Sequence, residues 1–292
     1  MTRPPRPVPY EPLDSNRFEL GECARWDGTS LWMVDILAGD LWRRTAADPL
    51  EHVLHLDVPL GAANPATGEK LVLAAGDGVA LLAADNTLDW LGRPASGMVP
   101  ARRMNDAAVD VQGRLWCGSM DYAGSPGNGA LHQVTADRTI VSAIEGLGCP
   151  NGPAFSGDGR WMYVVDSSTR VIQRHLIDAG GGAGRGDIFV TIPSEFGLPD
   201  GVTVDAEDHL WVALWGAGAI ARIDRSGKLT DLIGVPARQP TSVCFADEML
   251  IVTTARMGLR DPGPMDGAVL VMDAPVRGRP AERFICNDTP TT

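Results

Sequence analysis

The chain of 292 residues lacks any long hydrophobic run: no stretch approaches the 18 consecutive apolar residues that suggest a membrane-spanning helix. Segment 1–10 carries two arginines but no apolar stretch behind them, so we expect neither a signal peptide nor an anchor. The sequence therefore predicts a soluble protein without a membrane partner, with the cytoplasm as its compartment.

Basic residues are in deficit, with 25 Lys and Arg against 37 Asp and Glu and a formal net charge of -12. Such a surface repels the phosphates of nucleic acids and of anionic membranes. Nucleic-acid binding is therefore excluded as a function class, and a solvated surface that favours solubility explains the acidity.

Cysteines are few and show no paired spacing; they are Cys23, Cys117, Cys149, Cys244 and Cys286. An odd number without such spacing indicates neither a disulfide framework nor a zinc knuckle. A linker-like tract is also missing, so residues 1–292 are expected to form a single domain, with 1–14 as an irregular N-terminal arm.

Six short apolar runs recur along the chain at 31–34, 71–74, 115–118, 162–165, 210–213 and 250–253. The second residue of each run falls at 32, 72, 116, 163, 211 and 251, so the intervals range from 40 to 48 residues. A repeat of this length is typical of propeller blades or of helical arrays.

The residue types favour blades. The runs are too short for helices, are rich in aromatic and β-branched side chains, and follow turn residues such as those at 27–28 and 112–113. Further strand-like segments follow, for example at 40–44 and 129–134. Four strands in one repeat make a propeller blade, so we expect an all-β, six-bladed β-propeller. Residues 17–20 or 282–285 are expected to complete a blade shared by the chain ends.

Polar residues share one position upstream of the apolar runs. Ten to twelve residues before the second residue of each run stand Glu22, Gly61, Asn105, Asn151, Asp200 and the turn at 239–241. An equal phase means an equal place in each blade, so we expect these residues just before the innermost strands, at one mouth of the central channel.

Two carboxylates and two amides that converge on one point call for a cation, because buried like charges repel and need a partner. Oxygen ligands favour calcium, magnesium or manganese, and open sites with few protein ligands also take zinc or iron. None of the five histidines shares the phase. The sequence predicts one divalent metal in the central channel and leaves its identity open.

Several of these residues could instead have a purely structural role. The pairs at 151–152 and 200–201 are common turn formers. Trp32, Trp116 and Trp211 occupy the core position of the repeat, so we expect them to pack between blades and not to stack on a sugar. Asp35 and Asp166 are expected to make structural hydrogen bonds.

Four motifs in this order resemble the gluconolactonase and regucalcin family of sugar-lactone hydrolases over nearly the whole chain. They are 20–22 with Trp26, 103–106 running into 109–110 and 113–120, 150–156 with Asp166 and Ser167, and 199–201 with Asp205. Each motif alone is weak, but four at blade spacing are a specific signal for the family.

The resemblance implies that Glu22, Asn151 and Asp200 are metal ligands and that Asp200 is the catalytic general base. It implies that Arg103 binds substrate hydroxyls or the ring oxygen, and that Asn105 binds either substrate or metal. Asp121 and Tyr122 stand where regucalcin-like members use acidic residues to recognise the sugar. A bound metal would polarise the lactone carbonyl while a carboxylate accepts the proton of the attacking water.

The leading hypothesis is a metal-dependent lactonase that converts a sugar lactone to its aldonic acid. An esterase or organophosphate hydrolase on the same propeller is the alternative, and a non-catalytic calcium-binding propeller is the third, because fold does not imply function. The expected partner is a small-molecule sugar lactone, and the protein is expected to be a monomer or a small homo-oligomer.

Overall fold

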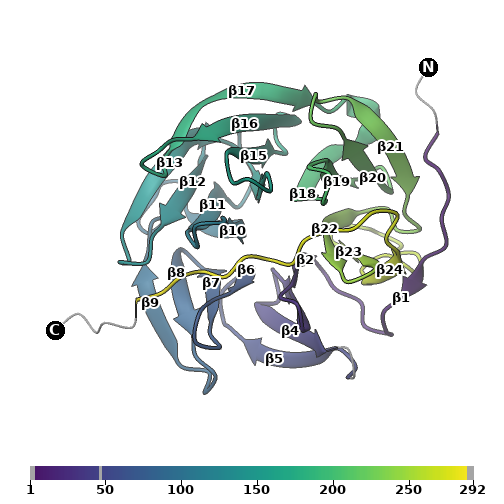
Figure 1. Ribbon diagram of the computed structural model, residues 1–292. Coiled ribbons are helices and arrows are strands. Elements are labelled where there is room, and N and C mark those ends of the chain that lie inside the picture. Colours follow the sequence, from purple (N-terminus) through teal and green to yellow (C-terminus); the bar gives the residue numbers. More distant parts are fainter. Residues whose placement is uncertain (1–3, 46–47, 288–292) are drawn as a thin grey trace.

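The structure, a computed structural model, describes residues 4–45 and 48–287. Its strands form six four-stranded sheets that surround a central axis (Figure 1). This confirms the predicted all-β, six-bladed propeller. In the described part of the chain no helix is long and apolar enough to cross a membrane.

Blades one to three contain the following strands, given from the axis outward. Blade one has β2 (Gly21–Trp26), β3 (Ser30–Asp35), β4 (Asp40–Thr45) and β5 (Glu51–His55). Blade two has β6 (Leu60–Pro65), β7 (Leu71–Ala75), β8 (Gly78–Leu82) and β9 (Leu88–Gly92). Blade three has β10 (Arg102–Val109), β11 (Leu115–Asp121), β12 (Gly129–Val134) and β13 (Ile140–Leu147).

Blades four to six follow the same order. Blade four has β14 (Pro150–Phe155), β15 (Trp161–Asp166), β16 (Val171–Ile177) and β17 (Ala183–Thr191). Blade five has β18 (Leu198–Val204), β19 (Leu210–Trp215), β20 (Ala219–Ile223) and β21 (Leu229–Gly234). Blade six has β22 (Pro240–Ala246), β23 (Met249–Thr254), β24 (Leu270–Asp273) and β1 (Glu11–Pro12).

The apolar runs lie in the second strand of each blade. The second strand has a neighbour on each side and a blade against each face, so nearly all of its side chains are buried. Trp116 and Trp211 are fully buried there, and each indole Nε1 donates a 2.8 Å hydrogen bond to an aspartate of the preceding turn, Asp110 or Asp205. These two tryptophans are packing residues, as expected.

The ring is closed by strand β1. Glu11 pairs with Val271 and Pro12 with Leu270, so β1 covers the outer edge of β24, whose backbone groups would otherwise lack partners. The expected irregular arm at 1–14 therefore contains, within its described residues 4–14, the strand Glu11–Pro12. The segments at 17–20 and 282–285 add no strand to blade six; each makes one isolated bridge, Leu20 with Ala255 and Phe284 with Ala66.

After β24 the chain crosses the ring again, as the yellow segment in Figure 1 shows. The N–H of Ala281 donates to the carbonyl of Trp26 at 2.7 Å, and that of Phe284 donates to Pro65 at 2.8 Å. Trp26 and Pro65 are the last residues of β2 and β6. The C-terminal segment therefore covers the channel end opposite to the starts of the innermost strands.

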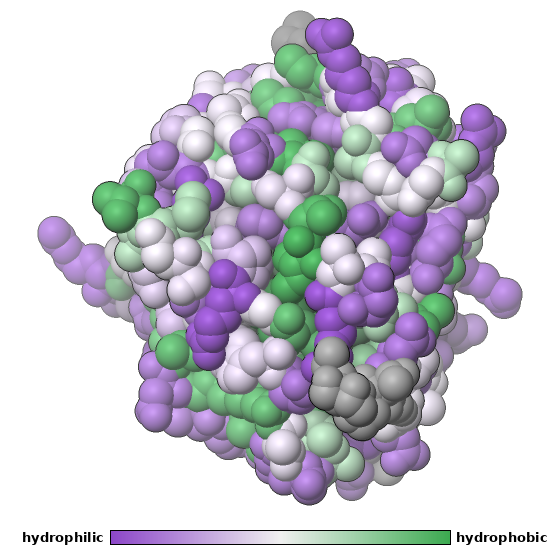
Figure 2. All heavy atoms as spheres, turned by 90° about the vertical axis from the view of Figure 1, so that its left-hand side faces the viewer, coloured by the Kyte–Doolittle hydropathy of each residue, from purple (hydrophilic) through white to green (hydrophobic). Residues whose placement is uncertain are grey.

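The outermost strands form the solvent-exposed surface of the ring. Most residues of β13 are exposed or half-buried, in contrast to the fully buried second strand of the same blade, β11. Figure 2 shows the side on which β9 and β13 lie, where hydrophilic residues surround small hydrophobic patches. The excess of acidic residues is accommodated on surfaces of this kind.

Candidate metal centre

Each of the four site-bearing innermost strands is interrupted by a β-bulge near its start. The ladder skips between Glu22 and Arg25, Met104 and Ala107, Asn151 and Ala154, and Pro199 and Val202. A bulge bends the strand and redirects side chains, and such bulges are common beside active sites. The site residues thus lie within the innermost strands, at or beside the bulge, and not ahead of these strands as predicted.

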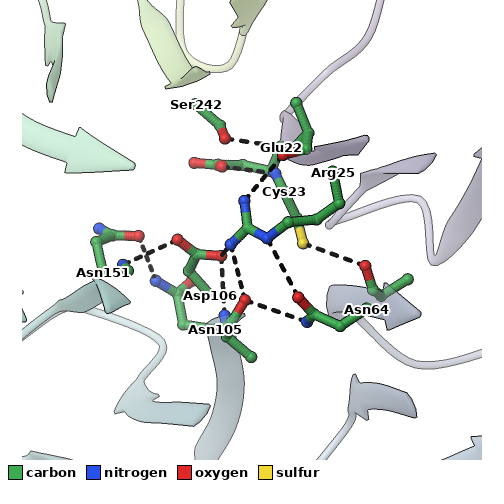
Figure 3. Close-up of polar contacts among 12 residues, drawn as sticks. Glu22, Cys23, Arg25, Asn64, Asn105, Asp106, Asn151 and Ser242 are labelled. Atoms are coloured by element: carbon green, nitrogen blue, oxygen red, sulfur yellow. Dashed lines mark hydrogen bonds and ion pairs between the residues drawn. The ribbon is translucent and has the colours of Figure 1, made fainter. Parts of the chain in front are cut away.

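The bulges bring four predicted side chains to one pocket of about 470 Å³ on the channel axis: Glu22, Asn105, Asn151 and Asp200. All four are buried, with exposed fractions of 3 to 8%. Figure 3 shows Glu22, Asn105 and Asn151 projecting toward the axis from different blades. Asn105 Nδ2 donates to Asn151 Oδ1 at 3.1 Å, so these two amides are in direct contact.

Neighbouring groups orient the candidate ligands. The backbone N–H of Cys23 donates to Glu22 Oε2 at 2.9 Å, and Asn151 Nδ2 donates to Ser167 Oγ at 2.9 Å. Asp35 accepts the backbone N–H groups of Glu19 and Leu20 at 2.8 and 3.0 Å, just ahead of β2. Asp166 does the same ahead of β14. Asp35 and Asp166 have the structural role that was expected.

Glu22 and Asp200 are two buried carboxylates whose charges repel each other. Burial, and then the nearby Asp106, raise the pKa of Glu22 to about 8, and burial followed by Glu22 raises the pKa of Asp200 well above its usual range. Among the described residues, neither carboxylate has a basic side chain at ion-pair distance. Two carboxylates and the Asn151 amide oxygen form an all-oxygen donor set that suits a divalent cation. These residues therefore fit the predicted metal.

A buried ion pair that sequence reasoning missed lies deeper in the channel. Arg25 Nη2 is 2.8 Å from Asp106 Oδ1, and Arg25 Nε donates to Asn64 Oδ1 at 3.2 Å. Asp106 also accepts the N–H of Gly152 at 2.8 Å. Asp106 stands beside Asn105 in a quoted motif, but no sequence pattern indicates that its partner is Arg25 of another blade.

The predicted substrate-binding residues take different places. Arg103 lines the pocket, where its Nη1 donates to Asn105 Oδ1 at 2.7 Å and to the Met104 carbonyl at 2.9 Å. Tyr122 lies at the rim and is 63% exposed. The structure does not bring Asp121 into the group: it is buried and accepts hydrogen bonds from residues of its own loop, namely Ala123, Ser125 and Asn128.

Gly61 explains why blade two contributes no ligand. A Cβ atom at this position would lie 2.4 Å from the carbonyl oxygen of Asn105, closer than any side chain allows. Blade two therefore approaches blade three closely at Gly61. The carbonyl oxygen of Asn105 occupies the space that a side chain at position 61 would need.

A second acidic cluster comprises Asp205, Glu207 and His209, whose potential ligand atoms lie within 4.8 Å of one another. Arg222 already supplies its cation, with Nη2 at 2.7 Å from Asp205 Oδ2 and 2.6 Å from Glu207 Oε2. This cluster is part of the turn between β18 and β19, so it is an internal ion-pair network and not a second metal centre.

Comparisons with known proteins identify the family of the chain. The SMP-30/Gluconolactonase/LRE-like region matches residues 20–256 of the chain. Pentonolactonase XacC of Haloferax volcanii is 33% identical, over 90% of this chain and 94% of that protein. The 6-deoxy-6-sulfogluconolactonase of Pseudomonas putida is 31% identical, over 81% of this chain and 84% of that protein.

Among solved structures, the calcium-binding protein regucalcin of Agrobacterium tumefaciens superposes with a TM-score of 0.91 at 27% identity, over 97% of this chain and 99% of that one. The family match, from residue 20 to residue 256, includes Glu22, Asn105, Asn151 and Asp200. The chain therefore belongs to the SMP-30/gluconolactonase/LRE-like family.

Proposed function

We propose that the protein is a divalent-metal-dependent hydrolase that opens the ring of a lactone. The observation that carries the proposal is the convergence of Glu22, Asn151 and Asp200 from three blades on one pocket, where burial and repulsion from neighbouring carboxylates raise the pKa values of both carboxyl groups. The printed names of two relatives, a pentonolactonase and a sulfogluconolactonase, support lactones as the substrate class.

In this proposal Glu22, Asn151 and Asp200 hold the metal. When bound, a divalent cation would polarise the lactone carbonyl and lower the pKa of a water molecule beside it. Calcium, zinc, manganese, magnesium and iron remain candidates, and the regucalcin relative, described as calcium-binding, favours calcium among them.

Asp200 is the proposed general base. Its carboxylate removes a proton from the attacking water as the water oxygen bonds to the carbonyl carbon. The bond from that carbon to the ring oxygen then breaks, and the proton passes to the departing ring oxygen, which gives a hydroxy acid. One water is consumed and no other reactant is needed.

Arg103 and Asn105 have positioning roles in this scheme. Arg103 presents its guanidinium to the pocket while Asn105 accepts one of its N–H groups and donates to Asn151. Asn105 thereby links the guanidinium of Arg103, which faces the substrate in this scheme, to Asn151, a proposed metal ligand. We assign it to holding both residues, which explains why an amide, able to accept and to donate at once, stands here.

The test is hydrolysis by metal-free and metal-loaded protein, measured as initial rates on lactones, aryl esters and phosphotriesters with each candidate cation. We expect lactone hydrolysis that disappears on chelation and returns with metal. Glu22→Gln and Asp200→Asn should lose at least about 100-fold in rate, the scale of removing a general base. The control Glu207→Gln alters the second acidic cluster and should match the parent.

Other outcomes discriminate the alternatives. Full activity of Asp200→Asn contradicts the assigned base. Faster turnover of esters or phosphotriesters than of lactones favours the alternative hydrolase. Tight metal binding with no turnover of any substrate favours a calcium-binding protein without catalysis.

A further inference from the structure

The pocket above the candidate metal centre has a polar floor and an apolar wall. The polar groups gather at the floor, where Glu22, Asn151 and Asp200 lie. Above them, on the side of blades five, six and one, the lining side chains are Leu20, Ile36, Leu37, Trp215 and Met257. A pocket for a polyhydroxylated ring needs hydrogen-bonding groups on its walls, which makes this distribution informative.

The apolar wall is built by the fold and is held in place by backbone hydrogen bonds. The N–H of Ile36 donates to the carbonyl of Leu20 at 3.0 Å, and that of Met257 donates to Glu19 at 3.0 Å. Trp215 and Met257 pack against the core cluster that contains Leu20 and Ile36. Leu20, Ile36, Trp215 and Met257 therefore form a preformed apolar surface, and Leu37, which is 45% exposed, lies at the pocket beside it.

Two hydroxyls above the floor are engaged with protein partners. Ser167 accepts a hydrogen bond from Asn151, and Ser168 Oγ donates to Asp166 Oδ1 at 2.8 Å. Arg103 is the one basic residue among those that line the pocket, and its Nη1 donates to Met104 and Asn105. Tyr122 adds a hydroxyl only at the rim, where the residue is 63% exposed. Opposite the wall, Met120 lines the pocket and its sulfur lies 3.6 Å from Cys149 Sγ.

We propose that the pocket selects a lactone that carries an alkyl or aryl substituent, with the carbonyl at the floor and the substituent against Ile36, Leu37, Trp215 and Met257. The inference rests on the proposed lactonase function and gives its substrate class. A buried hydroxyl without a partner is penalised against this wall, whereas each methylene that leaves water strengthens binding about fourfold.

The test compares lactones of one ring size. Initial rates of the metal-loaded protein are measured on γ-butyrolactone, γ-hexalactone, γ-octalactone and D-xylono-1,4-lactone. We expect kcat/KM to rise about fourfold per buried methylene along the alkyl series. γ-Octalactone should exceed xylonolactone by at least about tenfold.

Wall variants locate the effect. Leu37→Asn and Met257→Ser should lower kcat/KM for γ-octalactone by about fivefold to tenfold while γ-butyrolactone stays within about twofold, because only the former reaches the wall. Leu37 is 45% exposed, so its replacement leaves the core intact. Val141→Asn, at a position that is also 45% exposed but on the outer strand β13, is the matched control and should change neither rate.

Two negative outcomes are distinct. Hydrolysis of xylonolactone that equals or exceeds that of γ-octalactone, with wall variants like the parent, overturns this inference and leaves the lactonase function standing. Hydrolysis of no lactone from either group, by protein shown to bind metal, overturns both.

Discussion

The guanidinium of Arg25 lies 2.8 Å from the carboxylate of Asp106, and this ion pair joins blade one to blade three across the channel. Both side chains are buried, and Figure 3 shows them in contact. Because Arg25 is engaged with Asp106, it does not neutralise Glu22 or Asp200 at ion-pair distance. The pair therefore fills the channel below the pocket and leaves the two axial carboxylates for a metal.

Removing one partner of this pair should destabilise the fold strongly. We expect Arg25→Met and Asp106→Asn each to lower the free energy of unfolding by about 3–5 kcal/mol, since each leaves a buried charge uncompensated. Urea unfolding with chelator present measures this without a contribution from metal. The control Arg6→Met breaks an exposed pair with Asp231 and should cost at most about 1 kcal/mol. Equal effects of the two arginine variants would contradict the prediction.

Gly61→Ala should harm both stability and metal binding. Its new Cβ would meet the Asn105 carbonyl at 2.4 Å and push β10 away from β6. We expect a loss of about 1–3 kcal/mol, the range for overpacking, and a weaker thermal shift on addition of metal. Gly234→Ala is the control, because its nearest atoms lie at 3.5 Å. A parent-like thermal shift for Gly61→Ala would show that the Asn105 backbone does not position the site.

Phe284→Ala should destabilise the propeller from the mouth opposite to the pocket. The Phe284 side chain is 1% exposed and belongs to the main core cluster. We expect a loss of about 3–5 kcal/mol in unfolding free energy, as for other buried aromatic residues. Ile188→Ala, at a position that is 67% exposed, should change little. A small effect of Phe284→Ala would mean that the C-terminal segment is not part of the cooperative fold.

Deletion of residues 1–12 should lower the melting temperature by roughly 5 °C or more, which corresponds to a loss of about 2 kcal/mol in a protein of this size. The deletion removes β1 and exposes the edge of β24. Deletion of residues 1–5 keeps β1 and the bridge between Arg6 and Ile233, and should have a smaller effect. Equal melting temperatures for the two truncated proteins would contradict closure by β1.

The blade count and the phase of the site could be predicted because both are periodic in sequence. Trp116 and Trp211 mark equivalent buried positions, and Glu22, Asn105, Asn151 and Asp200 precede such positions at nearly constant spacing. Equal spacing in a closed ring becomes equal placement around its axis. For this reason the pocket contains the predicted ligands although they come from blades far apart in sequence.

Three features could not be predicted in the same way: the bulges, the hydrogen bonds of Asp121 and the strand β1. A bulge depends on how two strands pair, and Asp121 binds its own loop because that loop folds back over it. The short strand at Glu11–Pro12 contains a proline and an acidic residue, which a propensity argument assigns to a loop. Its pairing depends on the free edge of β24, which exists only once the ring has formed.

The sequence by itself thus determined the propeller, its six repeats and the polar residues that share one phase, since local periodicity carries that information. Only the tertiary structure decided which charges meet. Arg25 lies beside Asp106 and Arg222 lies beside Asp205, whereas no basic side chain of residues 4–45 and 48–287 forms an ion pair with Glu22 or Asp200. Partner choice among buried charges depends on distances across the ring, and such distances are absent from a linear pattern of residues.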